Sequence, residues 1–76
     1  MMKEKLIKII SNYVELDGIE VTEDSKFIGD LGFNSYDFMS LLGELEAEFN
    51  IEFDEADVVK IHTVKDAIDY MSSLVA

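Results

Sequence analysis

Apolar residues recur at helical spacing through the middle of this 76-residue chain, with polar residues between them. The residues that share this apolar face are Phe38, Leu41, Leu42, Leu45 and Phe49. A stripe of this width covers one side of a helix and has to be buried against other elements. We therefore predict a central helix from about Ser35 to Phe49, with its inner face in the core.

The residues at the start of this helix form a complete capping signal. Asn34 is expected at the N-cap, with Asp37 three positions later, where its charge favours the helix N-terminus. Phe33 and Phe38 occupy the two positions of a hydrophobic staple. Ser35 is then the first helical residue, and capping does not require its hydroxyl. A free hydroxyl at the positive end of a helix dipole suits a phosphate, so it indicates an attachment point more than a catalytic group.

A first helix is expected from about Lys3 to Leu16, with Gly18 as its C-terminal stop. Its apolar face would contain Leu6, Ile7, Ile9, Ile10, Tyr13 and Val14. The segment 19–33 that follows is long for a connection between helices, and such loops are usually functional or packed on themselves. The residues expected to hold it on the core are Val21, Phe27, Ile28 and Leu31.

Two more helices are expected after Asn50, which can close the central one. A short third helix would begin after the cap Asp54 and run to Ile61, with Val58, Val59 and Ile61 as its apolar anchors. The last helix would be capped by Thr63 with Asp66, and its inner face would contain Val64, Ala67, Ile68, Met71 and Leu74. The predicted fold is all-α: one domain, residues 1–76, forming a small four-helix bundle with a long first loop.

The composition excludes several classes of function. Seventeen acidic residues against six basic ones give a formal charge of −11, which is the wrong sign for nucleic acid binding. Nearly half of the residues are apolar, so the acidity does not imply disorder, and it favours steering toward basic partners. Neither a signal peptide nor an apolar run of membrane-spanning length is found, which predicts a cytoplasmic protein without membrane insertion.

The sequence offers little catalytic or metal chemistry. His62 is the only histidine, cysteine is absent, and no G-x-S-x-G nucleophile motif surrounds a serine. A calcium loop starting at Asp24 would place Lys26 and Ile28 where oxygen ligands are required. We therefore expect neither an enzyme nor a metal site.

Two stretches resemble acyl carrier proteins. Residues 30–35, Asp-Leu-Gly-Phe-Asn-Ser, are similar to the D-L-G-x-D-S motif whose serine carries 4′-phosphopantetheine, and residues 61–70 resemble the start of the family's last helix. The resemblance implies a bundle of the acyl-carrier type, with Ser35 modified by a separate phosphopantetheinyl transferase. Acyl groups would travel as thioesters on the cofactor, in fatty-acid or polyketide-type biosynthesis. Acyl-loading and acyl-processing enzymes with basic docking patches would be the partners of a monomeric carrier.

The same resemblance makes the helix after Ser35 the principal docking element. The residues expected to contact partners are Asp30, Tyr36, Asp37, Met39, Ser40, Glu44 and Glu48. Asn34 and Tyr36 depart from the family, which usually has Asp before the serine and Leu after it. The same serine could instead serve an aminoacyl, D-alanyl or peptidyl carrier, and an unmodified acidic adaptor is the rival class. Neither the cargo nor the pathway can be read from the residues.

Overall fold

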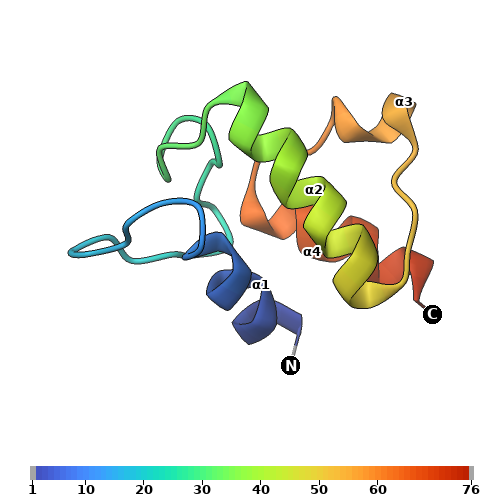
Figure 1. Ribbon diagram of the computed structural model, residues 1–76, viewed down its shortest axis with the longest axis horizontal. Helices are drawn as coiled ribbons and strands as arrows, with labels where there is room; N and C mark the ends of the chain where they lie inside the picture. Colours follow the sequence, from blue (N-terminus) through green and yellow to red (C-terminus); the bar gives the residue numbers. More distant parts are fainter. Residues whose placement is uncertain (1, 76) are drawn as a thin grey trace.

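The computed structural model describes residues 2–75, which contain four helices (Figure 1). They are α1 (Met2–Ile10), α2 (Ser35–Phe49), α3 (Glu55–Val58) and α4 (Val64–Leu74). Within these residues the extended pairing is one isolated antiparallel bridge, between Lys26 and Thr63. The predicted all-α bundle with a long loop and a short third helix is confirmed.

The core lies where α1, α2 and α4 meet under the long loop. In Figure 1, α2 crosses the front of the molecule, α4 lies behind it and α3 is set off to one side. The largest fully buried side chains come from all of these parts except α3: Phe27, Leu6, Ile10, Leu31, Leu41, Leu45, Met71 and Val64. The central stripe is therefore core as predicted, although Phe49 at its end is only partly buried.

Helix α1 ends at Ile10, so the prediction that it extends to Leu16 is wrong. Asn12 and Tyr13 donate instead to carbonyls three residues back, in tight turns. Tyr13 leaves the helical path to reach α2, where its hydroxyl donates to a Glu44 carboxylate oxygen at 2.7 Å. Gly18 has a φ of +75°, but it serves a later turn and does not end the helix.

The loop between α1 and α2 is tied to the connection between α3 and α4. The Phe27 N–H donates to the carbonyl of His62, and the Val64 N–H donates to the carbonyl of Ser25, both at 3.0 Å. Phe27 and Leu31 are buried as predicted. Ile28 is 56% exposed, so its expected place in the core is wrong: the chain turns at this point and presents neighbouring residues on opposite sides.

Helix α3 has four residues and ends at Val58, three positions before the predicted end at Ile61. Asp54 caps it by accepting from the Ala56 N–H at 2.9 Å. The next residues form tight turns in place of α-helical bonds, because the chain must become extended before the cap of α4. Ile61 reaches the core, but Val59 is 70% exposed, which corrects its assignment as an anchor.

Helix α4 begins with the predicted capping box. The Asp66 N–H donates to the Thr63 hydroxyl at 3.1 Å, and the Asp66 carboxylate accepts the Thr63 N–H at 3.1 Å. Val64, Ala67 and Met71 are buried on its inner face, and Ile68 is partly buried. Leu74 is 42% exposed, so the prediction that it is buried is wrong: the apolar stripe continues beyond the end of the core.

Candidate functional site

A compact turn brings the chain to the start of α2. The Asp30 carboxylate accepts the Lys26 N–H at 2.9 Å, and the Asp30 and Leu31 N–H groups both donate to the Lys26 carbonyl. Gly32 has a φ of +83°, a left-handed conformation that favours glycine. The Phe33 N–H then donates to the Phe27 carbonyl at 3.0 Å. These bonds set the direction in which the chain enters the helix.

Asn34 caps α2 as predicted. Its side-chain oxygen accepts the Asp37 N–H at 2.7 Å while its backbone is extended, with φ −95° and ψ 173°. Its carbonyl accepts the first helical bond, from Phe38. Ser35 is the first helical residue and is exposed, so its hydroxyl is not part of the cap.

The two predicted staple residues meet around a third aromatic ring. Phe33 and Phe38 are both buried, and the Phe27 ring lies 5.7 Å from the first and 5.2 Å from the second, centroid to centroid. Tyr13 packs on the other side of Phe33 at 5.9 Å. The helix start is therefore held by an aromatic cluster to which the loop between α1 and α2 contributes three rings, those of Tyr13, Phe27 and Phe33. Sequence spacing indicated Phe33 and Phe38, but only the folded loop brings Phe27 between them.

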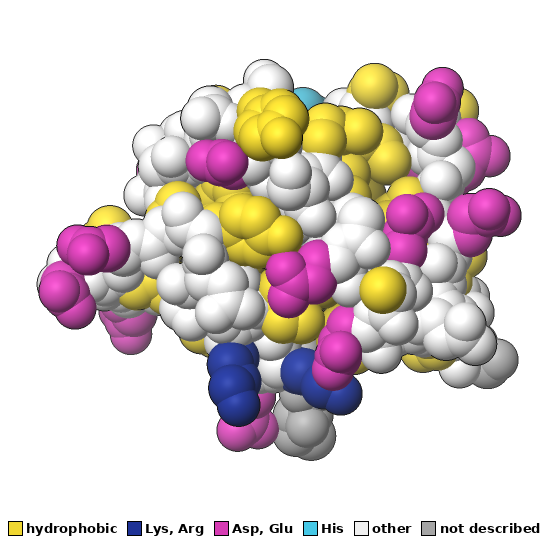
Figure 2. Space-filling view, viewed as in Figure 1, with side chains coloured by type: hydrophobic (Ala, Val, Ile, Leu, Met, Phe, Trp, Pro, Cys, Tyr) yellow, Lys and Arg dark blue, Asp and Glu magenta, His cyan; other side chains and the backbone are white. Residues whose placement is uncertain are grey.

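An apolar groove begins beside Ser35. Its lining residues come from the loop, α2, α3 and the connection to α4: Ile28, Ser35, Phe38, Met39, Val58, Val59, Ile61 and His62. Figure 2 shows the corresponding hydrophobic surface between the start of α2 and α3, with acidic side chains around it. Ile28 and Val59 were expected in the core, and their exposure is what makes this surface apolar. Each follows a more buried apolar residue in the sequence, Phe27 or the partly buried Val58, and the turn of the chain leaves it facing outward.

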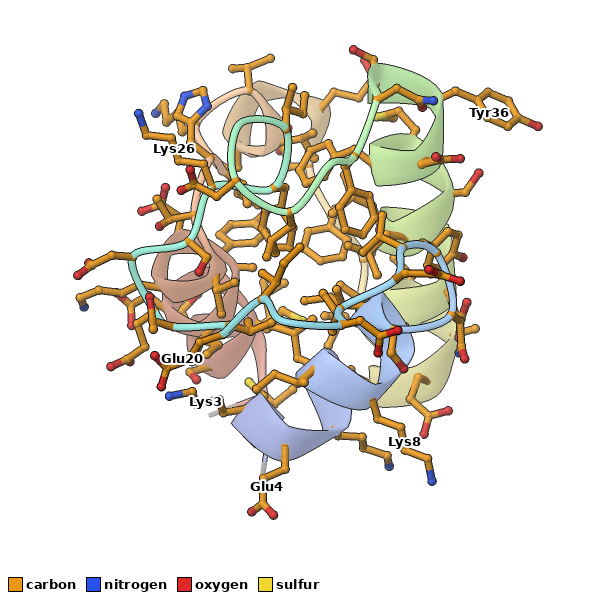
Figure 3. All side chains as sticks on the ribbon, turned by 90° about the vertical axis from the view of Figure 1, so that its left-hand side faces the viewer. Lys3, Glu4, Lys8, Glu20, Lys26 and Tyr36 are labelled. Carbon is orange, nitrogen blue, oxygen red and sulfur yellow. The ribbon has the colours of Figure 1, made fainter. Side chains whose placement is uncertain are left out.

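The residues predicted to contact partners lie in two groups. Tyr36 and Met39 flank Ser35 and are 79% and 57% exposed, whereas Asp37 and Ser40 are partly buried. Figure 3 shows Tyr36 pointing away from the body of the protein. This first group lies on the part of α2 that directly follows Ser35.

Three of the four acidic side chains in the set have partners within the chain. Glu48 forms an ion pair with Lys5 at 2.9 Å, and Asp30 closes the turn before the helix. Glu44 accepts from Tyr13, and this hydrogen bond to a carboxylate, reinforced by desolvation, raises the pKa of the Tyr13 hydroxyl. Glu44 and Glu48 therefore hold α1 and its loop on α2, a structural role that the sequence did not indicate.

Residues 2–75 contain no cluster of three or more His, Cys, Asp or Glu side chains arranged to hold a metal ion. The helices in this part of the chain are also too short or too polar to cross a membrane.

The start of α2 thus combines an exposed serine at a helix N-terminus with an adjacent apolar groove. The chain matches the family described as "Phosphopantetheine attachment site" over residues 4–71. It is 42% identical over 72 residues to the acyl carrier protein of Nitratidesulfovibrio vulgaris strain DP4, covering 95% of each chain. It is also 42% identical over 67 residues to the acyl carrier protein of Thermotoga maritima, covering 88% of this chain and 83% of that one. The chain therefore belongs to the phosphopantetheine-attachment family, as predicted.

The cofactor of this family is covalently attached 4′-phosphopantetheine, and the residues around the start of α2 fit such a group. The first-turn amides of a helix have no partners within the helix, and Asn34 takes up only that of Asp37. A phosphate on Ser35, the first residue of the helix, would lie at the positive end of the helix dipole. The apolar groove starts at the same residue.

Proposed function

We propose that the chain is a single acyl carrier domain, residues 1–76, and that the Ser35 hydroxyl is the attachment point of 4′-phosphopantetheine. The assignment is supported by the different roles of two adjacent side chains at the start of α2. Asn34 caps the helix while the neighbouring serine hydroxyl stays exposed. A serine needed for capping would have its oxygen occupied, whereas this oxygen is accessible to a modifying enzyme.

When bound, the cofactor supplies a terminal thiol that holds the acyl group as a thioester. The protein's residues fix where the arm begins and what surrounds it. Asn34 and the aromatic cluster of Phe27, Phe33 and Phe38 hold the helix start rigid. The first-turn amides stabilise the negative charge of the phosphodiester. The protein itself makes and breaks no bond of the acyl group. It acts as a tether that raises the local concentration of the acyl group at each partner enzyme.

The partners in this proposal are a phosphopantetheinyl transferase and enzymes that load or process acyl groups, in fatty-acid or polyketide-type biosynthesis in the cytoplasm. The carrier would act as a monomer. Tyr36 and Met39 would provide exposed apolar contacts beside Ser35, and the surrounding acidic side chains would attract basic patches on these enzymes (Figure 2). The acidic contacts would come from Asp30, Asp37, Glu44 and Glu48, with Ser40 between them.

The attachment site is tested by intact mass after incubation with coenzyme A and a broad-specificity phosphopantetheinyl transferase. The wild-type chain should gain the mass of one phosphopantetheinyl group. Ser35→Ala should gain none, while its circular dichroism spectrum remains that of the wild type. Ser72→Ala, which changes an exposed serine on α4 outside the docking surface, is the matched control and should be modified normally. An unmodified wild-type chain would favour the acidic adaptor, and a modified Ser35→Ala chain would place the cofactor elsewhere.

The docking surface is tested by the rate of the same modification. Met39→Ser removes an apolar side chain that is 57% exposed beside Ser35, and Ile19→Ser removes one that is 42% exposed in the loop. We expect the Met39 variant to be modified more slowly than the Ile19 variant, at similar melting temperatures. Equal rates for the two variants would contradict the assignment of the Tyr36–Met39 surface to docking.

A further inference from the structure

A site for a positively charged side chain lies at the C-terminal end of α2. The Lys5 ammonium lies 2.9 Å from Oε1 of Glu48 and 5.6 Å from the centroid of the Phe49 ring. A carboxylate and an aromatic face at such distances both attract a cation. The structure therefore contains a small cation site, formed by Glu48 and Phe49, and the chain's own lysine fills it.

Lys5 is not needed to hold α1 on the core. Leu6, Ile9 and Ile10 of the same helix are buried, whereas the side chains of Lys5 and Glu48 are 53% and 42% exposed. Exposed ion pairs contribute little to stability, because water competes for both charges. The ammonium can therefore leave the cation site while α1 stays in place.

The cation site is better suited to an arginine than to the lysine that occupies it. The Lys5 ion pair uses one of the two carboxylate oxygens of Glu48. A guanidinium group can donate to both oxygens at once and can also stack on an aromatic ring. The chain contains no arginine, so a guanidinium group at this place has to come from another molecule.

The cation site belongs to the helix on which partners are proposed to dock. Glu48 follows Ser35 by 13 positions in α2, about 20 Å along the helix axis. An interface of ordinary size spans that distance, so a partner whose active site reaches Ser35 can also contact Glu48. Figure 2 shows lysine side chains beside acidic ones along the lower edge of the face that α2 crosses.

We propose that Lys5 is an internal competitor of the carrier's basic partners: an arginine of the partner displaces it and binds between the Glu48 carboxylate and the Phe49 ring. This inference rests on the proposed docking of basic enzymes on α2. In the free protein Lys5 neutralises Glu48 and weakens the attraction of every basic molecule. A partner without an arginine at this place gains nothing by displacing the lysine, so the ion pair selects against it.

The test measures the initial rate of phosphopantetheine transfer from coenzyme A, by intact mass, with the transferase at low ionic strength and the carrier below saturation. Lys5→Gln removes the competitor and leaves Glu48 in place. Lys3→Gln is its matched control: it makes the same charge change on the same helix, on the side away from α2 (Figure 3), and Lys3 is in no ion pair among residues 2–75. We expect Lys5→Gln to be modified about 1.5–5 times faster than Lys3→Gln, the range for an exposed ion pair.

The preference for a guanidinium group is tested without any change of charge. Lys5→Arg places a stronger internal competitor at the cation site, so it should be modified more slowly than the wild type. Circular dichroism and melting temperature verify that each variant is folded at the assay temperature. A Lys5→Arg chain modified as fast as the wild type, or faster, would refute the arginine preference.

Glu48 variants show whether the partner uses this carboxylate. Glu48→Gln should be modified more slowly than Glu20→Gln, which makes the same charge change in the loop, on the side away from α2 (Figure 3). In the Glu48→Gln background, Lys5→Gln should lose its advantage over Lys3→Gln, because competitor and site act through the same contact.

Four results would overturn the proposal, and each has its own signature. Equal rates for Lys5→Gln and Lys3→Gln, with a slow Glu48→Gln, would show that Glu48 docks without competition. Equal rates for Glu48→Gln and Glu20→Gln would show that the partner does not use the cation site. An advantage of Lys5→Gln that persists without Glu48 would assign the effect to net charge. A wild-type chain that gains no mass would reject the attachment at Ser35 itself, and intact mass distinguishes that failure from the others.

Discussion

Replacing Asn34 with alanine separates capping from attachment at the start of α2. The substitution removes the side-chain oxygen that accepts the Asp37 N–H at 2.7 Å and leaves the adjacent serine untouched. Loss of an N-cap of this type costs about 0.5–2 kcal/mol. We expect a value near the middle of that range, about 1 kcal/mol, because the bond is short but Asn34 is exposed and water can replace part of it.

For a domain of this length, a loss of about 1 kcal/mol corresponds to a fall of about 4–8 °C in the melting temperature. Thermal unfolding followed by circular dichroism at fixed pH and salt concentration measures this shift. Asn34→Asp retains an equally good cap and should melt near the wild type. Ser35→Ala should also melt near the wild type, because its hydroxyl is not part of the cap. If Ser35→Ala lost as much stability as Asn34→Ala, the conclusion that Asn34 caps the helix and Ser35 does not would be refuted.

Three further predictions concern the rest of the fold. Leu45→Ala, at a fully buried position, should reduce the free energy of unfolding by about 2–5 kcal/mol in urea titration, and an unchanged midpoint would show that the core is assigned wrongly. Gly43→Ala should raise that free energy by up to about 1 kcal/mol, because nothing lies within 4 Å of the added Cβ and alanine favours the helix; a lower midpoint would reveal a hidden contact. The N–H groups of His62 and Thr63 donate to the Asp66 carboxylate and hold its pKa in the folded protein below the ordinary value of 3.8. The ionised carboxylate therefore stabilises the fold above pH 3.8, and this stabilisation is lost as the pH falls through the lowered pKa. Asp66→Asn should therefore melt at a lower temperature at neutral pH and depend less on pH in the acid range, and an unchanged acid dependence would contradict this account.

The bounds and caps of α2 could be predicted because their determinants lie close together in the sequence. Asn34 is three residues from the amide that it caps, and Asn50, at the other end, adopts the left-handed conformation that closes the helix, with a φ of +55°. The capping box of α4 is equally local. At these places the fold follows from the chemistry of a few neighbouring residues.

The features that sequence reasoning missed depend on partners distant in the chain. Helix α1 ends early where Tyr13 turns to a carboxylate 31 residues away, a contact that no local pattern indicates. Ile28 and Val59 were assigned to the core because they are apolar, but adjacent apolar residues in short turns cannot all face inward. Ser35 was predicted as the attachment point from its motif alone and stays a prediction, whereas the groove beside it required the positions of four separate segments.

The bridge between Lys26 and Thr63 also determines when the serine becomes part of an ordered surface. It joins residues 37 positions apart, so the turn before α2 cannot be fixed until most of the chain is available for folding. Thirty residues separate Ser35 from Lys65, whose N–H donates to the loop at Glu23. At synthesis rates of about 5–20 residues per second, Ser35 is made roughly 1.5–6 s before Lys65. The folded surface at the start of α2 is therefore completed only after the chain has been synthesised as far as Lys65.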